Sequence, residues 1–372
     1  MKKPIFNPWE IKGEIDYNKL IKEFGISPLS TLPDVFNKEL LFRRKIIFAH
    51  RDIQRILEAK RDNKKFVMMT GLMPTGKFHI GHAIVAKHFL FYQKLGAKIY
   101  IAVADIEAYN ARGQSLEESR KIAIEEYITN YIALGLKPEN CQIYFQSKRS
   151  KNSEKSNAYY QLQNLLARHA TFNEFKAVYG EITPGKMVSA LLQASDMLSP
   201  QLKEFENPCP VVVPVGIDQD PHLRLARDIA KRIKNPSFTQ LSSTYHLFAP
   251  GLKGLESKMS ASDPNSYIAL TDTPKEVKNK INKYAFSGGQ PTLEEHKAKG
   301  GNPDIDVSFQ YLRMLLEEDD KKLEQIKNDY KSGKLTTGEL KKYTIEKINT
   351  FLEKHQKEMI KAKKQIPKFL DN

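Results

Sequence analysis

Short apolar runs alternate with helix-like stretches through the middle of the chain. Four of the runs have the length and flanking glycines of buried strands, and they lie at residues 66–71, 99–103, 143–145 and 211–215. Because strands that alternate with helices favour a parallel sheet with crossover helices, we expect an α/β fold of the doubly wound, Rossmann-like kind.

The helices between these runs carry recognisable ends. The apolar spacing after His79 predicts a helix that continues to Leu95 and ends at Gly96. Ser115 has Glu118 three residues further on, as in a capping box, and predicts a helix that ends near residue 134. A third helix is expected at residues 219–233, directly after the fourth apolar run.

The regions on either side of these strands and helices show a different pattern of apolar and polar residues. Residues 1–60 form an N-terminal appendage, with a short helix predicted around Ile15 to Phe24 and a strand-like run at 46–48 beside the basic cluster 43–45. Residues 150–205 are mostly helical with a break at Pro184, and residues 241–270 are irregular or strand-like.

After Thr271 the pattern is helical to the end of the chain. Thr273 followed by Pro274 predicts a helix start. Near the C-terminus, one helical face collects the residues Ile345, Ile348, Leu352, His355 and Met359. We therefore expect three parts: an appendage at 1–60, a Rossmann-like domain at 61–272 with a helical insertion at about 105–205 and a loop at 252–264, and an all-helical domain at 273–372.

Composition and charge narrow the class of protein. The 372 residues are 40% hydrophobic and 28% charged, which excludes disorder for most of the chain. Lysine and arginine exceed aspartate and glutamate by 59 to 44, and residues 321–372 alone hold 14 lysines against seven acidic residues. A polyanionic partner such as nucleic acid is one explanation. A lysine-rich proteome or a solvated outer helix face is the other.

Cysteine use and hydropathy exclude further classes. Cys141 and Cys209 are too few for a disulfide scaffold or a four-cysteine zinc site, and we expect no protein metal site. The longest uncharged apolar run, at about 211–217, is far shorter than a membrane span, and no apolar signal segment follows Met1. We expect no membrane partner and a cytoplasmic location.

The most informative motif lies between the first apolar run and its helix, in the sequence from Pro74 to His82. The free N–H groups of a helix N-terminus bind phosphate well. His79 and His82 are three residues apart, so they share one helix face and both imidazoles can donate to phosphate oxygens. Gly81 lets a flat group pack on the backbone. Two ordinary surface histidines near a helix start are the alternative.

Two further motifs follow later strands. Lys258 begins a Lys-Met-Ser-Ala-Ser run on a loop that contains Gly251 and Gly254, so its ammonium group could swing onto a phosphate. An ordinary turn is the alternative. Asp218 follows the fourth apolar run and opens a helix, a position from which carboxylates bind ribose hydroxyls. A plain helix cap is the alternative here.

The order and spacing of these motifs resemble the class I aminoacyl-tRNA synthetases, and within them the tryptophan enzymes of archaeal and eukaryotic type. The resemblance extends over nearly the whole chain. It rests on blocks at residues 7–9, 15–17, 42–44, 49–52, 79–82, 217–221, 258–265, 285–289, 300–302 and 306–309.

The resemblance implies a reaction and its participants. Tryptophan would be activated by ATP to an adenylate and then transferred to its tRNA, tRNA(Trp), with Mg²⁺ bound alongside ATP. A catalytic set is implied, consisting of His79, His82, Lys258 and Ser260. The implied ATP-binding residues are Thr75, Gly81, Asp218, Gln219 and Met259. The resemblance also implies an anticodon-binding role for residues 273–372 and a homodimer.

The amino-acid pocket matches the family less closely. Relatives commonly place a Tyr and a Gln against the indole, where this chain has Met69 and Ala102. By resemblance, Glu107 and Gln193 hold the ammonium and carboxylate groups. Asp196 matches a carboxylate that reads the side chain in bacterial tryptophan enzymes and in tyrosine enzymes. The implied amino-acid-binding set is therefore Met69, Glu107, Gln193 and Asp196.

Several alternatives stay open at this point. An indole N–H and a phenol O–H can both donate to Asp196, so that residue does not separate tryptophan from tyrosine, whereas the C-terminal blocks favour tryptophan. A catalytically silent RNA-binding relative is a second class, which the intact His79, His82 and Lys258 disfavour. A small-molecule adenylyltransferase is a third, which the basic helical tail disfavours.

Overall fold

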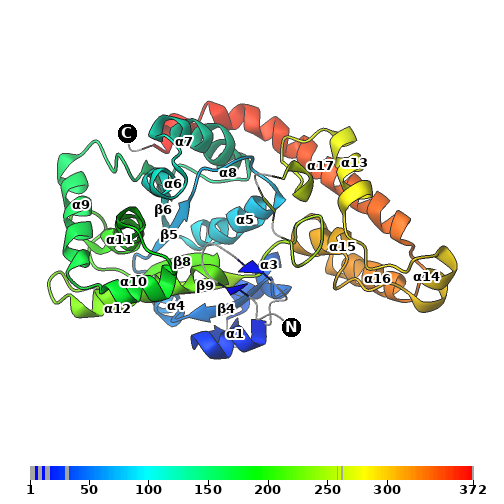
Figure 1. Ribbon diagram of the computed structural model, residues 1–372, viewed down its shortest axis with the longest axis horizontal. Helices are drawn as coiled ribbons and strands as arrows, with labels where there is room; N and C mark the ends of the chain where they lie inside the picture. The colour runs from blue at the N-terminus through cyan, green and yellow to red at the C-terminus, as the bar shows by residue number, and fades with distance from the viewer. Residues whose placement is uncertain are drawn as a thin grey trace.

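A seven-stranded sheet forms the centre of the molecule (Figure 1), with strand order β3-β4-β9-β8-β5-β6-β7. This computed structural model describes residues 5–6, 11–12, 17–29, 33–257, 259–260 and 263–370. The strands of the sheet are β3 (Ser27–Pro28), β4 (Ile47–Arg51), β5 (Val67–Leu72), β6 (Lys98–Val103), β7 (Cys141–Phe145), β8 (Val211–Gly216) and β9 (Ser242–His246). A separate hairpin pairs β1 (Ile5–Phe6) with β2 (Ile11–Lys12).

Five neighbouring strands, β9, β8, β5, β6 and β7, run parallel, which confirms the predicted Rossmann-like α/β fold. The N-terminal strands β4 and β3 extend this sheet, each antiparallel to its neighbour, so the sheet is mixed and the segment 1–60 contributes to it. A hydrophobic run at 46–48 predicts a strand without its direction, because direction depends on which partner the strand pairs with.

The helices that follow the strands match the sequence pattern closely. Helix α5 (Ile80–Leu95) follows β5 and ends at Gly96, whose φ of 103° suits a residue without a side chain. Helix α6 (Asp105–Arg112) follows β6, and α12 (Asp220–Arg232) follows β8 through a short 3-10 turn. The helix expected from Ser115 is divided by a π-helical turn, Ala123–Ile128, into α7 (Leu116–Ile122) and α8 (Thr129–Ala133).

The expected helical insertion at 105–205 contains β7, which pairs with β6 in the main sheet. Its continuous helical part comes after that strand, as α9 (Ser153–Ala167), α10 (Phe172–Tyr179) and α11 (Pro184–Leu198). Pro184 occupies the first turn of α11, so the predicted break is a helix start, where proline is well tolerated.

Side chains of the central strands alternate between two hydrophobic clusters, one on each face of the sheet. In β6, Ile99, Ile101 and Val103 belong to one cluster, while Tyr100 and Ala102 belong to the other. The first cluster includes α5, α8 and the C-terminal helices, and the second includes α9 to α12. The sheet is therefore covered on both faces, as a parallel sheet requires.

The C-terminal region is helical, as expected. Its helices are α13 (Pro274–Tyr284), α14 (Leu293–Lys299), α15 (Val307–Tyr311), α16 (Asp320–Lys331) and α17 (Thr337–Lys363). Helix α17 runs diagonally back to α8 (Figure 1), where the buried His355 lies 2.6 Å from the side-chain oxygen of Asn130. Ile348, Leu352 and His355 are buried and Ile345 and Met359 half-buried, which confirms the predicted apolar face.

Smaller elements complete the description. Helix α1 (Tyr17–Phe24) confirms the predicted N-terminal helix, although Ile15 and the block 7–9 lie outside the described residues. The short helices α2 (Asp34–Asn37) and α3 (Leu40–Arg43) precede β4, and α4 (Gln54–Arg61) follows it. Of the helices in the described part of the chain, none combines the length and apolar character needed to cross a bilayer.

Candidate active site

Two cavities lie side by side at the carboxyl ends of β5 and β8. The first has a volume of about 410 Å³ and the second about 310 Å³. Thr70, Gly71, Val215 and Gln219 line both of them. In open α/β sheets ligands bind at these strand ends, so the position agrees with a composite substrate site.

The first cavity is bordered by the N-terminus of α5. His79 is the residue before the helix, and its backbone N–H donates to Nδ1 of His82 at 3.3 Å. The two half-buried rings stack with centroids 3.7 Å apart. Because Nδ1 of His82 accepts this bond, the neutral ring carries its proton on Nε2.

Burial sets the charge of both histidines. Loss of solvation lowers the pKa of His82 to about 4, and desolvation together with the neighbouring His82 lowers the pKa of His79 well below its usual value. Both rings are therefore neutral at pH 7, and each has one N–H to donate. This arrangement suits hydrogen bonding to phosphate oxygens without proton transfer.

The segment that follows the Lys258 motif pairs with the backbone around the start of α5. The Ile80 N–H donates to Ile268 O at 3.1 Å, and the Leu270 N–H donates to Phe78 O at 3.0 Å. A Cβ atom placed on Gly81 would lie 3.0 Å from Sδ of Met259. The glycine of the first motif therefore lies directly against the methionine of the second.

Asp218 and Gln219 line the first cavity on its other side, after β8. The Gln219 amide donates to Asp218 Oδ2 at 3.3 Å. A Cβ atom on Gly216 would lie 2.6 Å from Asp218 Oδ1 and 3.0 Å from the ring of Phe248. Gly216 is thus required for the close approach of the Asp218 carboxylate.

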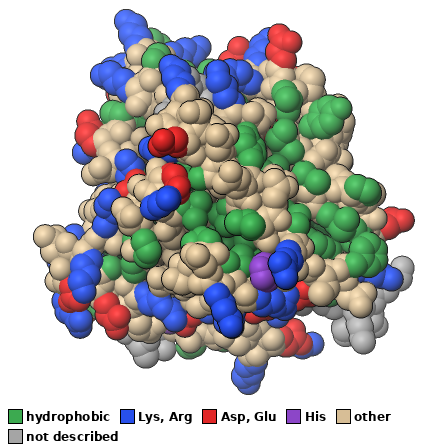
Figure 2. Space-filling view, turned by 90° about the vertical axis from the view of Figure 1, so that its left-hand side faces the viewer, with side chains coloured by type: hydrophobic (Ala, Val, Ile, Leu, Met, Phe, Trp, Pro, Cys, Tyr) green, Lys and Arg blue, Asp and Glu red, His purple; other side chains and the backbone are tan. Residues whose placement is uncertain are grey.

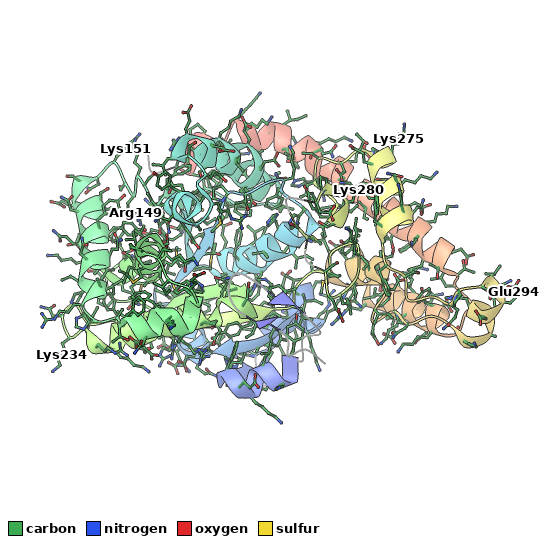
Figure 3. The ribbon with its side chains drawn as sticks, in the orientation of Figure 1. Arg149, Lys151, Lys234, Lys275, Lys280 and Glu294 are labelled. Carbon is green, nitrogen blue, oxygen red and sulfur yellow. The ribbon has the colours of Figure 1, made fainter. Side chains whose placement is uncertain are left out.

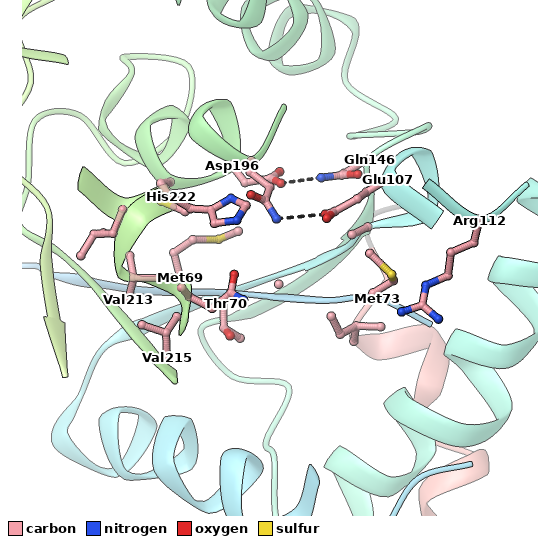
Figure 4. A pocket seen from close by; sticks show the side chains of 17 residues that line it. Met69, Thr70, Met73, Glu107, Arg112, Gln146, Asp196, Val213, Val215 and His222 are labelled. Atoms are coloured by element: carbon pink, nitrogen blue, oxygen red, sulfur yellow. Dashed lines mark hydrogen bonds between the residues drawn. The ribbon is translucent and has the colours of Figure 1, made fainter. Parts of the chain in front are cut away.

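The second cavity is lined by side chains from several elements (Figure 4). Its walls combine apolar residues such as Met69, Val213 and Leu223 with a polar group formed by Glu107, Gln146, Gln193, Asp196 and His222. Met69 lies on β5, Glu107 on α6 and Asp196 on α11. An apolar cavity with a few convergent polar groups is the usual form of a small-molecule site.

Asp196 is 4% exposed and accepts three hydrogen bonds from protein groups. The hydroxyls of Tyr144 and Tyr159 each donate to Oδ1 at 2.7 Å, and the Gln146 amide donates to Oδ2 at 2.8 Å. Burial raises the pKa of Asp196 to about 6, against the opposing effect of these three donors and of Arg149. The carboxylate is therefore ionised at pH 7 and can accept a further bond.

Glu107 forms the second buried carboxylate of this cavity. The Gln193 amide donates to Glu107 Oε2 at 3.0 Å, which leaves the Gln193 carbonyl oxygen buried without a hydrogen bond. The side-chain oxygen of Gln146, Oε1, is also buried without a hydrogen bond. Desolvation raises the pKa of Glu107 to about 7. The cavity is thus rich in acceptors and suits a ligand that brings several N–H groups.

The structure brings most of the predicted site residues together. His79, Gly81, His82, Asp218 and Met259 line the first cavity, Met69, Glu107, Gln193 and Asp196 line the second, and Gln219 lines both. Thr75 and Ser260 do not line either cavity. Thr75 accepts from the Tyr127 hydroxyl at 2.8 Å, and the Ser260 N–H donates to Ser266 Oγ at 2.9 Å. Lys258 lies outside the described residues.

Sequence reasoning missed part of the polar wall. Gln146 follows β7 directly, at the same edge of the sheet as Asp105 and Asp218, so strand-end position was a usable signal. His222, whose Nδ1 lies 2.7 Å from the Tyr179 hydroxyl, is one helical turn beyond Asp218. The sequence around Tyr144 and Tyr159 does not indicate a role in the site, because each residue has the pattern of an ordinary buried aromatic residue.

Comparison with known proteins supports one family. Residues 60–353 match the family described as tRNA synthetases class I (W and Y). A tryptophan–tRNA ligase of Methanocaldococcus jannaschii is 44% identical over 100% of this chain and 99% of its own length.

Solved structures lead to the same family. The crystal structure of the tryptophanyl-tRNA synthetase from Aeropyrum pernix has a TM-score of 0.89 at 41% identity and covers 95% of this chain and 96% of its own. The crystal structure of a tryptophanyl-tRNA synthetase from Encephalitozoon cuniculi, bound to tryptophan, has a TM-score of 0.83 at 30% identity. It covers 96% of this chain and 98% of its own. The chain therefore belongs to the class I tRNA synthetases of the W and Y type.

Proposed function

We propose that this chain attaches tryptophan to tRNA(Trp) in two steps at the paired cavities. The tryptophan carboxylate first attacks the α-phosphate of ATP, forming tryptophanyl-adenylate and releasing pyrophosphate. A ribose hydroxyl at the 3′ end of the tRNA then attacks the adenylate carbonyl, and AMP leaves. The main structural support is that the two cavities share Thr70, Gly71, Val215 and Gln219, so that their ligands would meet.

The first cavity would hold ATP. The neutral N–H groups of His79 and His82 would donate to phosphate oxygens, and Gly81 would leave room for adenine beside Met259. Asp218 would accept from the ribose hydroxyls, with Gln219 beside it. The loop residues Lys258 and Ser260 would neutralise and orient the leaving pyrophosphate, and Thr75 would act from the loop before α5.

Mg²⁺ would enter with the triphosphate. Among the residues that the structure describes, no group of three or more His, Cys, Asp or Glu is arranged to hold a metal ion. Mg²⁺ is usually held mainly by water and substrate phosphate oxygens. When bound, the ion would offset phosphate charge during the first step.

The second cavity would hold the amino acid. Glu107 and the carbonyl oxygen of Gln193 would accept from the α-ammonium group, while Asp196 would accept from the indole N–H. Met69, Val213 and Leu223 would pack against the rings. The attacking carboxylate is already an anion, so positioning and charge neutralisation suffice and no general base is required.

The helical region 273–372 is proposed to contact the tRNA anticodon, next to a catalytic domain at 61–272 that carries the nucleotide sites. On α13 an exposed groove is lined by Lys275, Lys278, Asn279, Asn282 and Lys283, and Figure 3 shows Lys275 at the outer surface. Phosphate contacts release counterions. The Kd for tRNA should therefore rise more than about tenfold between roughly 50 and 200 mM salt, and a flat response would contradict this role.

A homodimer is the proposed assembly. Figure 2 shows the side of the molecule that carries α9 to α12, where apolar side chains gather on the surface. On this side Leu165 is 53% exposed, Phe172 59% and Val188 41%. Large exposed apolar areas mark interaction sites. Light scattering should give twice the chain mass, and Phe172→Glu should give the monomer.

The first experiment is amino-acid-dependent exchange of labelled pyrophosphate into ATP, with each of the twenty amino acids and without tRNA. Exchange with tryptophan alone supports the proposal. Exchange with tyrosine alone would identify tyrosine, in place of tryptophan, as the substrate. Absence of exchange with every amino acid would favour an RNA-binding relative or activation that depends on tRNA. The reaction would be carried out in the cytoplasm, where tRNA is used.

A further inference from the structure

Arg149 is a fully buried arginine without a direct ionic partner among the described residues. Its side chain has 0% exposure, and its Nε and Nη2 atoms make no hydrogen bond. One long contact joins Nη1 to Gln142 Oε1 at 3.5 Å. Figure 3 shows Arg149 beside α11 in the interior, whereas Lys151, two residues further on, lies at the edge of the molecule. A buried guanidinium needs compensation from elsewhere.

Aromatic rings supply that compensation. The guanidinium carbon lies 3.8 Å from the ring centroid of Tyr144, 4.5 Å from Phe205, 5.4 Å from Tyr100 and 5.8 Å from Tyr159. A cation over an aromatic face is attracted by the negative potential of the ring, more strongly when water is excluded. Arg149 therefore sits in an aromatic cage formed by Tyr100, Tyr144, Tyr159 and Phe205.

The hydroxyls of the cage are bound to carboxylates. Tyr144 and Tyr159 both donate to Oδ1 of Asp196. Tyr100 donates to Oε1 of Glu206 at 2.8 Å. A phenol that donates to an anion gains electron density in its ring, which strengthens the attraction for a cation on its face. Arg149 thus lies across single phenol rings from Asp196, whose charge it opposes, and from Glu206, which pairs directly with Lys65 at 2.7 Å.

The groups that face Asp196 come from several elements. They are Glu107 on α6, Tyr144 on β7, Arg149 after β7, Tyr159 and Tyr160 on α9, and His222 on α12. Burial raises the pKa of the tyrosines and lowers that of His222 to about 3, so these side chains are neutral at pH 7. Of these groups Arg149 alone is a cation, since Arg112, further along the wall in Figure 4, acts on Glu107.

We propose that Arg149 is a positioning residue for tryptophan selection, which acts through Tyr144 and Tyr159 to keep Asp196 an ionised acceptor for the indole N–H. This inference rests on the proposed function. Arg149 does not line the amino-acid cavity, so it would not touch the substrate. Tyr144 and Tyr159 link its charge to Asp196, which lines that cavity.

The direction of the pH effect follows from the charge of Arg149. Asp196, with a pKa of about 6, loses its acceptor charge as the pH falls through that value. Removal of a nearby cation raises the pKa of a carboxyl group. When Arg149 is replaced by an uncharged residue, Asp196 should therefore lose its negative charge at a higher pH. Selection for the indole N–H is then already weakened at pH 7.

The experiment compares tryptophan with 3-(1-benzothiophen-3-yl)alanine, in which sulfur replaces the indole N–H. The readout is the ratio of kcat/KM for the two amino acids in pyrophosphate exchange, from pH 5 to pH 8.5. Both substrates carry the same ammonium group, so titration of Glu107 and of the ATP site cancels. In Arg149→Met the fall of this ratio should shift up by about one pH unit, which lowers the ratio about twofold at pH 7 and close to tenfold at pH 5.

Two further variants act as controls. Arg149→Lys keeps the charge and should retain most of the wild-type ratio. Arg120→Met removes an arginine whose guanidinium carbon lies 4.5 Å from the ring of Phe145. Phe145 lies on β7 next to Tyr144 but on the face of the sheet away from Asp196, so this variant should leave the ratio unchanged. If Arg149→Met is insoluble, Arg149→Gln takes its place.

The outcomes separate the two proposals. Wild-type protein that exchanges no label with tryptophan overturns the proposed function itself. Exchange with tryptophan but an unshifted ratio in Arg149→Met overturns the role of Arg149 alone. A wild-type ratio that stays constant down to pH 5 also overturns that role, without the need for any variant.

Discussion

The two cavities differ in what their walls are made of. The first is built around the start of α5, Gly81, Gly216 and a loop methionine, so much of its shape comes from backbone and from residues close together in sequence. The second is built from side chains on β5, α6, β8, α11 and α12 and just after β7, with hydrogen bonds that join α11 to Glu107 and to Gln146. The proposed phosphate site therefore uses local groups, whereas the proposed site for the amino-acid side chain is assembled across the fold.

This contrast predicts that changes in one cavity leave binding to the other almost intact. Lys258→Ala tests it with the largest effect. A charge needed mainly as pyrophosphate leaves should matter for rate more than for binding, so adenylate formation should slow by about 10²–10³-fold. The Kd for tryptophan should stay within about twofold. Single-turnover kinetics and equilibrium tryptophan binding measure the two quantities.

A neighbouring lysine provides the matched control for this variant. Lys253, which pairs with Asp263 at 2.6 Å, lies on the same loop, and Lys253→Ala should have a much smaller effect on rate. Equal losses in the two variants, or a loss of tryptophan binding without a loss of rate in Lys258→Ala, would contradict the division of roles.

Asp196→Asn tests the second cavity. The asparagine side chain carries no charge, and its NH₂ group cannot accept a hydrogen bond from Gln146 or from the indole N–H. The kcat/KM for tryptophan should therefore fall by about 10²-fold. The KM for ATP should change little. Glu206→Gln is the control, because Glu206 also accepts from a tyrosine but lines neither cavity. A rise in the KM for ATP as large as that for tryptophan would show that the cavities are not separable.

The pH dependence of tryptophan binding sharpens the comparison. Glu107, with a pKa raised to about 7 by burial, is protonated as the pH falls below that value and loses its attraction for the ammonium group. The KM for tryptophan should therefore rise about tenfold per pH unit below pH 7. The neutral His79 and His82 predict a flat KM for ATP over pH 6 to 8. In steady-state kinetics of Glu107→Gln the rise of this KM just below pH 7 should be absent, and only the loss near pH 6 that comes from Asp196 should remain.

Gly81→Ala has the smallest expected effect. The added methyl group would lie 3.0 Å from Met259 Sδ and 3.1 Å from the His79 ring, so these side chains must shift by a few tenths of an ångström. The KM for ATP should rise by about threefold to tenfold, which corresponds to the cost of modest overpacking. An unchanged KM for ATP would show that adenine does not pack at this position.

Much of the α/β framework could be predicted before the structure was known. The strands β5, β6, β7 and β8 and the helices α5 and α12 all carry local signals, namely apolar runs, helical spacing and a terminal glycine or cap. The direction of β4 carried no such signal. Pairing between strands is decided by contacts between residues far apart in the chain.

The site divides in the same way. The sequence by itself pointed to the motif at His79 to His82, the strand-end carboxylate Asp218 and the lysine-containing loop, because the proposed phosphate site uses short segments of chain. Only the tertiary structure decided that Gln146, Tyr144 and Tyr159 surround Asp196, and that Arg149 lies behind them. The physical reason is that a buried charge must be compensated by whichever groups the fold packs against it, and those groups come from separate strands and helices.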